Sequence, residues 1–444
     1  MDKPQEVKSS VKKFAGITVP DDLTKTNFFN LYLATFFIGC LMTFPAIIQP
    51  ALLKDVIGIS QENYGSLNSA LQNMSQIATL FFVGFVGYLS DKHGRRILAI
   101  LGFTIMTIFY ILFGYSKEIA FAMGVTSING QVFVAFVIRF IIGIGLILGY
   151  PQFITMVADY TFEKDRGKGM ALNGLCMGLA SMMIFGVFAQ IAKKTGLSSI
   201  FYMAGIMSFL GLLVSRFGVV DRMPKEKPEK KSFKEIYQVV AKSTTLKVSY
   251  VATFVSRADV VVIATLLVAW MVAVADKYGL TSMQATAKGG IAIIVMSLVS
   301  FLAFPIIGIL LDRWGRVQVL IISLILAGAG LCLILTLENP FSKFLYIYMA
   351  LFGIGMSGAV VGANTLATDG APIGMTGTIL GGLNTMQPIG ILIFLQVGGF
   401  LFDKLGYASP FVLKGLADLL VGIWIIFVRG KIVHEYALKK GVRG

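Results

Sequence analysis

Two arginines and two aspartates lie deep inside long apolar stretches of this chain, where a charge is expensive to bury. They are Arg139, Arg257, Asp259 and Asp418. A carboxylate in such surroundings can take up and release a proton, and a guanidinium can bind a carboxylate or a phosphate. Both histidines, His93 and His434, fall outside the apolar stretches. Proton chemistry inside these stretches is therefore assigned to aspartate.

Arg257 and Asp259 are close in sequence but are expected to have different partners. Residues two apart on a helix do not face each other, so these charges do not neutralise one another. A rise of about 1.5 Å per residue puts Asp259 about 18 Å along the helix from Lys247, near the middle of its apolar stretch. Either charge could line a cavity at that depth.

Asp259 is the better candidate proton carrier of the two aspartates. Asp418 follows Lys414 by one helical turn, and that spacing favours an ion pair between them. Burial of Asp259 favours its protonated form, whereas a nearby Arg139 or Arg257 favours its charged form. The sequence leaves this balance open.

Polar side chains also recur along the apolar stretches. Asn68, Gln72 and Gln76 are spaced four apart and form one stripe on a helix, which lines either a solute path or a hydrogen-bonded contact between helices. Pro388 follows another polar pair and can bend its helix and free backbone carbonyls, so binding and hinge interpretations both stay open there. The candidate substrate-binding residues are Arg139, Arg257, Asn68, Gln72, Gln76, Asn364, Asn384 and Gln387.

The elements that carry these residues are membrane-spanning helices. The chain has 444 residues, of which 56% are hydrophobic and 14% charged, and its mean hydropathy is +0.80. Lipid must be the solvent for so much apolar surface, and backbone groups in lipid are satisfied within helices. We predict an all-α integral membrane protein with twelve spans, at 29–53, 65–89, 96–115, 131–157, 168–191, 198–219, 248–274, 288–311, 317–337, 344–367, 376–401 and 410–429.

The distribution of charge predicts the topology. A net charge of +15 could suggest a nucleic-acid partner, but most Lys and Arg residues fall in alternate segments between spans, as expected when those segments face the cytoplasm. We expect both termini to be cytoplasmic, the membrane to be the plasma (inner) membrane, and no nucleic acid to bind. The predicted organisation is a cytoplasmic segment 1–28, a six-helix bundle 29–219, a linker 220–247 that can touch anionic lipid, a second bundle 248–429 and a cytoplasmic tail 430–444.

The two bundles are repeats of one another. Gly87–Arg95 and Gly308–Arg316 both fit Gly-x-Leu-x-Asp-(Lys/Arg)-x-Gly-Arg, a match too specific for chance at corresponding places. Six spans return the chain to its starting side, so the repeats are parallel and related by an axis along the membrane normal. After one shift of frame in the segment 116–130, the alignment continues at Gly143, Gly145 and Asp159, which match Gly353, Gly355 and Asp369.

This architecture and its doubled loop resemble the major facilitator superfamily of secondary transporters over nearly the whole chain. The resemblance implies that the loop latches the two halves together on the cytoplasmic side. Its gating residues would be Gly87, Asp91, Gly94 and Arg95 in the first copy and Gly308, Asp312, Gly315 and Arg316 in the second.

The residues of the loop support two interpretations. Gly94 permits a tight turn, and Gly87 is expected to be small for helix packing. Ala99 departs from the family, which usually has a larger apolar residue there. The alternative to a latch is a turn whose basic residues only set the topology.

The fourth predicted span carries a second resemblance. Arg139, Gly143 and Gly145 are spaced as in the family pattern Arg-x-x-Gln-Gly-x-Gly, with Ile142 in place of the glutamine. The resemblance implies that Arg139 couples proton movement to conformational change, and a structural arginine that satisfies nearby carbonyls is the alternative. The fifth span lacks the Gly-Pro of the family's drug and proton exchangers, which argues against multidrug antiport.

The predicted function is secondary active transport of a small solute, as two halves rock about a midplane site with protons as the coupling ion. Two arginines against one central aspartate slightly favour an anion. An efflux antiporter or a lipid flippase of the same fold is the alternative, and a non-transporting membrane sensor is more remote. An enzyme is not expected, because no nucleophile is matched with a base. We expect no cofactor or metal, a lipid environment and a monomer.

Overall fold

A computed structural model of the protein describes residues 12–222, 233–372 and 375–443. The first half contains β1 (Lys13–Phe14), β2 (Ile17–Thr18), α1 (Lys25–Ala51), α2 (Tyr64–His93), α3 (Arg95–Gly114), α4 (Ser116–Ala122), α5 (Ile128–Tyr160), α6 (Arg166–Met183), α7 (Ala189–Thr195) and α8 (Leu197–Phe217). The second half contains α9 (Phe233–Lys242), α10 (Thr244–Ser256), α11 (Asp259–Ala273), α12 (Ser282–Arg313), α13 (Arg316–Cys332), α14 (Phe344–Gly370), α15 (Thr376–Leu405) and α16 (Ser409–Arg443).

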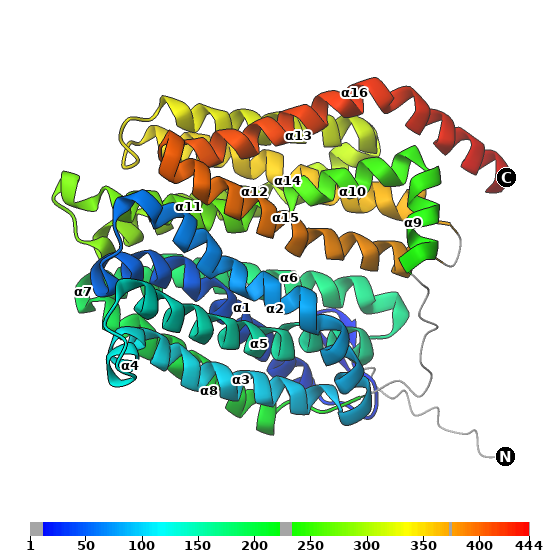
Figure 1. The fold of residues 1–444 in the computed structure, drawn as a ribbon. Helices are drawn as coiled ribbons and strands as arrows, with labels where there is room; N and C mark the ends of the chain where they lie inside the picture. Colours follow the sequence, from blue (N-terminus) through cyan, green and yellow to red (C-terminus); the bar gives the residue numbers. More distant parts are fainter. Residues whose placement is uncertain (1–11, 223–232, 373–374, 444) are drawn as a thin grey trace, which may run out of the picture.

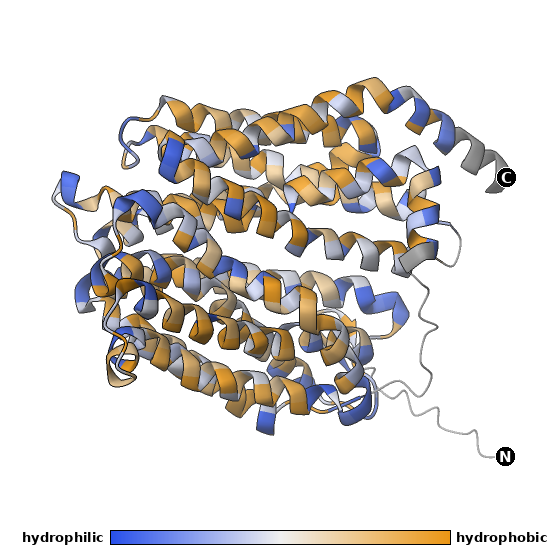
Figure 2. Cartoon of the chain, in the orientation of Figure 1, coloured by the Kyte–Doolittle hydropathy of each residue, from blue (hydrophilic) through white to orange (hydrophobic). Residues whose placement is uncertain are grey.

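The long helices form two bundles that lie side by side, as Figure 1 shows, with the first half below and the second above. Twelve helical segments of the described chain are long and apolar enough to cross a membrane, which confirms the predicted number of spans. Apolar residues dominate their middle parts and hydrophilic residues gather at both ends (Figure 2). We call the side that carries the start of α1 and the end of α16 the terminal side, and the opposite side the distal side.

The repeat is visible in how the helices pack. A Cβ on Gly145 of α5 would lie 3.0 Å from the carbonyl oxygen of Gly102 on α3, and one on Gly355 of α14 would lie 2.6 Å from the carbonyl oxygen of Ser323 on α13. Small residues at matching places therefore bring matching helices together in both halves. The frame shift also lies where predicted, because the longer segment of the first half forms the short helix α4.

Three spans are interrupted, which the sequence did not predict. The first ends in a π-helical segment, Leu52–Ile57, and the fifth contains one at Ile184–Phe188. The seventh is broken into α10 and α11, and the break consists of Arg257 and Ala258. Interruptions of this kind are common at functional sites of helices, and in transporters broken helices surround the midplane site.

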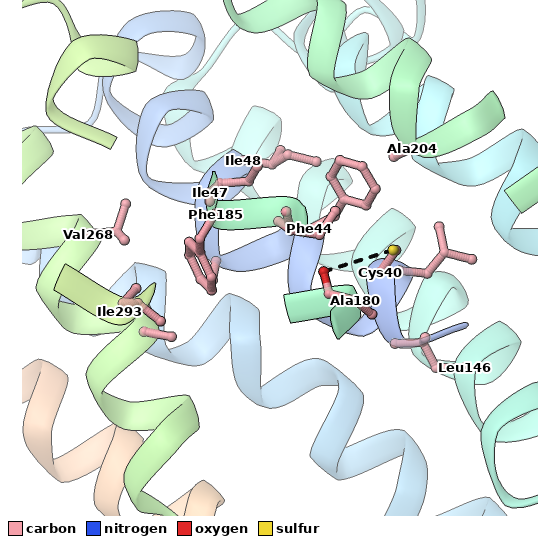
Figure 3. Packing of buried hydrophobic residues seen from close by; sticks show 14 of the residues in the cluster. Cys40, Phe44, Ile47, Ile48, Leu146, Ala180, Phe185, Ala204, Val268 and Ile293 are labelled. Atoms are coloured by element: carbon pink, nitrogen blue, oxygen red, sulfur yellow. Dashed lines mark hydrogen bonds between the residues drawn. The ribbon is translucent and has the colours of Figure 1, made fainter. Parts of the chain in front are cut away.

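An apolar seam joins the two halves near the distal side. Phe185 of the fifth span lies close to Ile293 of α12 and Val268 of α11 (Figure 3). The backbone carbonyl of Phe185 approaches α12 so closely that a Cβ on Gly290 would lie 2.7 Å from it. Within the first half, the thiol of Cys40 on α1 lies 4.0 Å from the carbonyl oxygen of Ala180 on α6 (Figure 3). This seam places polar groups of both halves next to one another.

Candidate functional site

A buried polar cluster lies inside the first half, around Arg139 of α5. Its Nη2 donates to Oε1 of Gln72 on α2 at 3.3 Å, and Nε2 of Gln49 on α1 donates to the same oxygen at 3.1 Å. Arg139 is 1% exposed. Asn68, on the same stripe of α2, donates to the carbonyl of Thr265 across the seam at 3.4 Å. At Gln72 and Asn68 the predicted stripe therefore makes contacts between helices.

The guanidinium of Arg139 has spare donors. Its Nε and Nη1 have no hydrogen-bond partner among the described residues, and neither has Oδ1 of Asn68. A buried guanidinium is costly unless each N–H meets an acceptor. Spare guanidinium donors of this kind match the acceptor oxygens of a carboxylate or a phosphate. Gln76, one turn further along α2, is only partly buried.

Arg257 occupies the break in the seventh span and faces the other half. Its Nη2 donates to Oδ1 of Asn364 on α14 at 3.3 Å, which brings these two predicted binding residues together. Tyr150 of α5 lies close enough to Arg257 for the two groups to interact electrostatically. Tyr150 was missed from the sequence because an aromatic residue in an apolar helix carries no distinguishing signal.

Asp259 follows that break as the first residue of α11, and its partner differs from that of Arg257, so the expectation of different partners is confirmed. Its carboxylate pairs with Lys414 of α16, and Nζ of Lys414 also lies 3.1 Å from each carboxylate oxygen of Asp418. The predicted pair of Lys414 and Asp418 is present. The cation that pairs with Asp259 is thus Lys414, which the sequence had paired only with Asp418, because Asp259 points toward α16.

Two other predicted residues lie on the terminal half of α15. Asn384 is exposed and Gln387 is partly buried. Helix α15 packs on α2 of the first half, where Asn73 of α2 donates to the carbonyl of Leu392 of α15 at 3.1 Å. Asn384 and Gln387 are thus located on the terminal side of the contact between α2 and α15.

The halves are held together by polar contacts near the distal side. Lys54 pairs with Asp276 at 2.8 Å. Asp403 of α15 accepts hydrogen bonds from the backbone N–H groups of Gly65 and Ser66 at the start of α2, at 2.7 and 2.8 Å. A carboxylate at a helix N-terminus is favourable because it satisfies free N–H groups. These contacts between the halves were missed from the sequence, because they depend on which loops of the two halves meet.

On the terminal side, the doubled loop makes contacts within each half. Arg95 pairs with Asp159 at the end of α5, and both side chains are 8% exposed. In the second copy Nε of Arg316 lies 2.5 Å from Oδ2 of Asp369 at the end of α14. The pairs are related by the repeat, so one arginine of each loop anchors it to its own bundle.

The glycines of the loop have two different roles. Gly94 and Gly315 have φ of +98° and +89°, so the expected tight turns are present. The packing role expected for Gly87 is wrong in this conformation, because a Cβ there, or on Gly308, would meet no described atom within 4 Å. The reason is that neighbouring helices pack on other residues of these helices, Val86 of α2 and Ile307 of α12, so both glycines lie on an open face. Asp91 is partly buried and Asp312 is exposed.

The chain belongs to the Major Facilitator Superfamily. The family model matches residues 31–298 and again residues 250–441. Among relatives, the magnetosome protein MamH of Paramagnetospirillum magneticum is 28% identical over 396 residues, which cover 89% of this chain and 91% of that protein. MamZ of the same organism is 26% identical over 423 residues, 94% of this chain and 65% of that longer protein. The human synaptic vesicular amine transporter is 23% identical over 364 residues, covering 79% and 64%.

Solved structures show the same fold at low sequence identity. A nucleoside transporter, NupG, aligns with a TM-score of 0.70 at 13% identity, covering 90% of this chain and 98% of that one. A D-xylose-proton symporter aligns with a TM-score of 0.69 at 16% identity, covering 90% and 97%. The protein is therefore a multi-pass membrane transporter rather than an enzyme.

Proposed function

We propose that the protein is a proton-coupled secondary transporter that moves a small solute, preferably an anion, by alternating access. The observation that carries the preference is the buried guanidinium of Arg139, whose Nε and Nη1 lack partners. A bound anion would supply the missing acceptors and the missing charge. Arg257 and Asn364 add donors from the second half, so a solute between the halves can contact both.

The terminal side is proposed to be cytoplasmic, which agrees with the distribution of Lys and Arg. The polar contacts between halves that involve Lys54, Asp276 and Asp403 all lie near the distal side. We infer that this conformation is closed toward the exterior and that the solute site is reached from the cytoplasm. The gating role of Asp91, Asp312 and their loops then belongs to the opposite conformation, in which the terminal ends of the bundles meet.

Asp259 is the proposed proton site. It is fully buried at the break of the seventh span, two residues from Arg257. Protonation of a buried carboxylate changes its pairing with a neighbouring cation. A change at Asp259 can therefore reach the solute site through the short break between the two helices.

The experiment starts with thermal unfolding of purified protein against a panel of small carboxylates, phosphate and sulfate, with matched cations and neutral solutes. The anion that stabilises the protein is then followed into proteoliposomes under an imposed pH gradient. We expect Arg139→Gln to lose both stabilisation and uptake, whereas Arg166→Gln, which changes an exposed arginine, keeps both. Stabilisation by cations alone, or full uptake by Arg139→Gln, would contradict the proposal.

Direction of transport is a separate question. A multidrug efflux pump homologue of Lactococcus lactis is 22% identical over 407 residues, 90% of this chain and 94% of that protein. This relative, an efflux pump by name, favours efflux, and an efflux antiporter is therefore the second candidate. The same proteoliposomes distinguish the two, because a symporter accumulates solute when the outside is acidic and an antiporter when the inside is acidic.

A further inference from the structure

Lys414 lies between two carboxylates inside the second half. Its Nζ pairs with Asp259 of α11 and lies 3.1 Å from both oxygens of Asp418, one turn away on α16. Lys414 is 1% exposed, and Asp259 and Asp418 are 0% exposed. We call these three residues the buried triad.

The charges of the buried triad do not balance when all three groups are ionised. Two carboxylates and one ammonium leave one negative charge, and an uncompensated charge in a buried site is strongly unfavourable. One proton on either carboxylate makes the triad neutral. Since both carboxylates contact the same ammonium, the proton belongs to the pair and not to one residue alone.

The surroundings supply no second cation. Among the described residues, the groups that face the triad from neighbouring elements are the thiol of Cys332 on α13 and the ring of Phe394 on α15, whose centroid lies 5.2 Å from Nζ of Lys414. From α1, α2 and α12, which also pack on α11, no described charged side chain acts on Asp259. A proton is therefore the cation that completes the triad.

The buried triad is placed where it can act on the solute site. Asp259 is the first residue of α11, directly after the break that contains Arg257. Further along α16, Glu435 accepts hydrogen bonds from the backbone N–H groups of Thr244 and Thr245 at the start of α10, at 2.7 and 3.0 Å. Helix α16 thus holds the seventh span on both sides of its break.

We propose that Asp259, Lys414 and Asp418 form one proton-binding site, in which a single proton is shared by the two carboxylates and decides which of them pairs with Lys414. Taking up the proton converts one carboxylate to a carboxylic acid, and Lys414 then pairs with the other. Pairing with Asp259 ties α11 to α16, whereas pairing with Asp418 alone releases the first turn of α11 and the adjacent Arg257. This inference rests on the proposed function and extends it, because Asp418 and Lys414 become as necessary as Asp259.

The test is infrared difference spectroscopy of the purified full-length protein in lipid as the pH is changed, with the proton itself as the probe. The signal is the carbonyl stretch of a buried carboxylic acid. We expect the parent to show one such band that appears as pH falls. Asp259→Asn and Asp418→Asn should each abolish it, since either change leaves a neutral pair with Lys414. Glu163→Gln, which removes an exposed carboxylate, should leave it unchanged.

Three further results decide the matter. Return of the band in Asp418→Glu supports the shared site. If Asp418→Glu and Asp418→Asn also have the same elution and unfolding temperature, misfolding is excluded as the cause of the lost band in Asp418→Asn. A band that survives in Asp418→Asn but not in Asp259→Asn overturns the shared site and leaves Asp259 as the sole carrier. A parent without any titrating band also overturns it. The proposed transport of an anion through Arg139 is tested separately by uptake, so its failure is distinguishable.

Discussion

The carboxylate of Asp403 accepts a hydrogen bond from the backbone N–H of Gly65 at 2.7 Å, across the seam between the two halves. The other oxygen accepts from Ser66 at 2.8 Å, so one side chain of α15 caps the start of α2. Opening the distal side has to break both bonds. We therefore propose that Asp403 is a component of a distal gate, together with the pair of Lys54 and Asp276.

We predict that Asp403→Asn shifts the protein toward the conformation that is open on the distal side. Hydrogen bonds to a charged group contribute about 1.5 to 3 kcal/mol each, so the population should change by about tenfold or more. Reaction of a single cysteine near Gly65 with a membrane-impermeant thiol reagent measures the shift. Glu118→Gln, an exposed carboxylate of the first half, is the control; equal reactivity in both variants would argue against the gate.

The two repeat-related ion pairs should differ in their contribution to stability. Arg95→Gln leaves Asp159 buried without its cation, which costs about 3 kcal/mol or more, because both partners are 8% exposed. Arg316→Gln should cost only about 0 to 1 kcal/mol, because that pair is 36% and 25% exposed. Unfolding of both variants in a denaturing detergent measures the difference. Equal losses would contradict the contrast in burial.

Two glycines of the repeat should respond in opposite ways to one added methyl group. Gly355→Ala forces a Cβ to within 2.6 Å of the carbonyl oxygen of Ser323 and should destabilise the protein by about 1 to 3 kcal/mol. Gly87→Ala meets open space inside α2 and should stabilise the protein slightly, by about 0.5 to 1 kcal/mol, because alanine favours a helix more than glycine does. If Gly87→Ala nevertheless slows transport, its surface is needed in the other conformation. A stable Gly355→Ala would contradict the packing described for α13 and α14.

The doubled loop is expected to gate the terminal side. Removing the charge of Asp91, or of its repeat Asp312, should weaken the conformation in which the terminal ends of the halves meet. Single cysteines on the terminal ends of α2 and α15 should then react faster in Asp91→Asn and Asp312→Asn. Unchanged rates in both variants would favour the alternative, in which the basic residues of the loop only set the topology.

The sequence was sufficient for the fold because the features that define it are local. Apolar length predicts the spans, and the loops that contain Gly94 and Gly315 reveal the repeat. The sequence also predicted that Arg257 and Asp259 would have different partners, since residues two apart on a helix do not face each other.

The contacts of the site that the sequence did not predict depend on how the helices are rotated relative to one another. Lys414 lies one turn from Asp418, so that pair was predictable, whereas its contact with Asp259 requires α16 to face α11. Helices that are apolar on every side carry no stripe that would reveal such a rotation. The break at Arg257 was hidden for a related reason, because no Gly or Pro marks it.

The most direct test of alternating access is labelling of Asn364→Cys in sealed vesicles, with Cys40, Cys176 and Cys332 replaced by serine. The side chain of Asn364 contacts Arg257 in the second half, and Leu420→Cys, at a position that is 66% exposed on α16, is the lipid-facing control. We predict that an impermeant thiol reagent labels Asn364→Cys from the terminal side, and from the distal side when Asp403→Asn is also present. Labelling from neither side, or from one side regardless of Asp403, would contradict transport by alternating access.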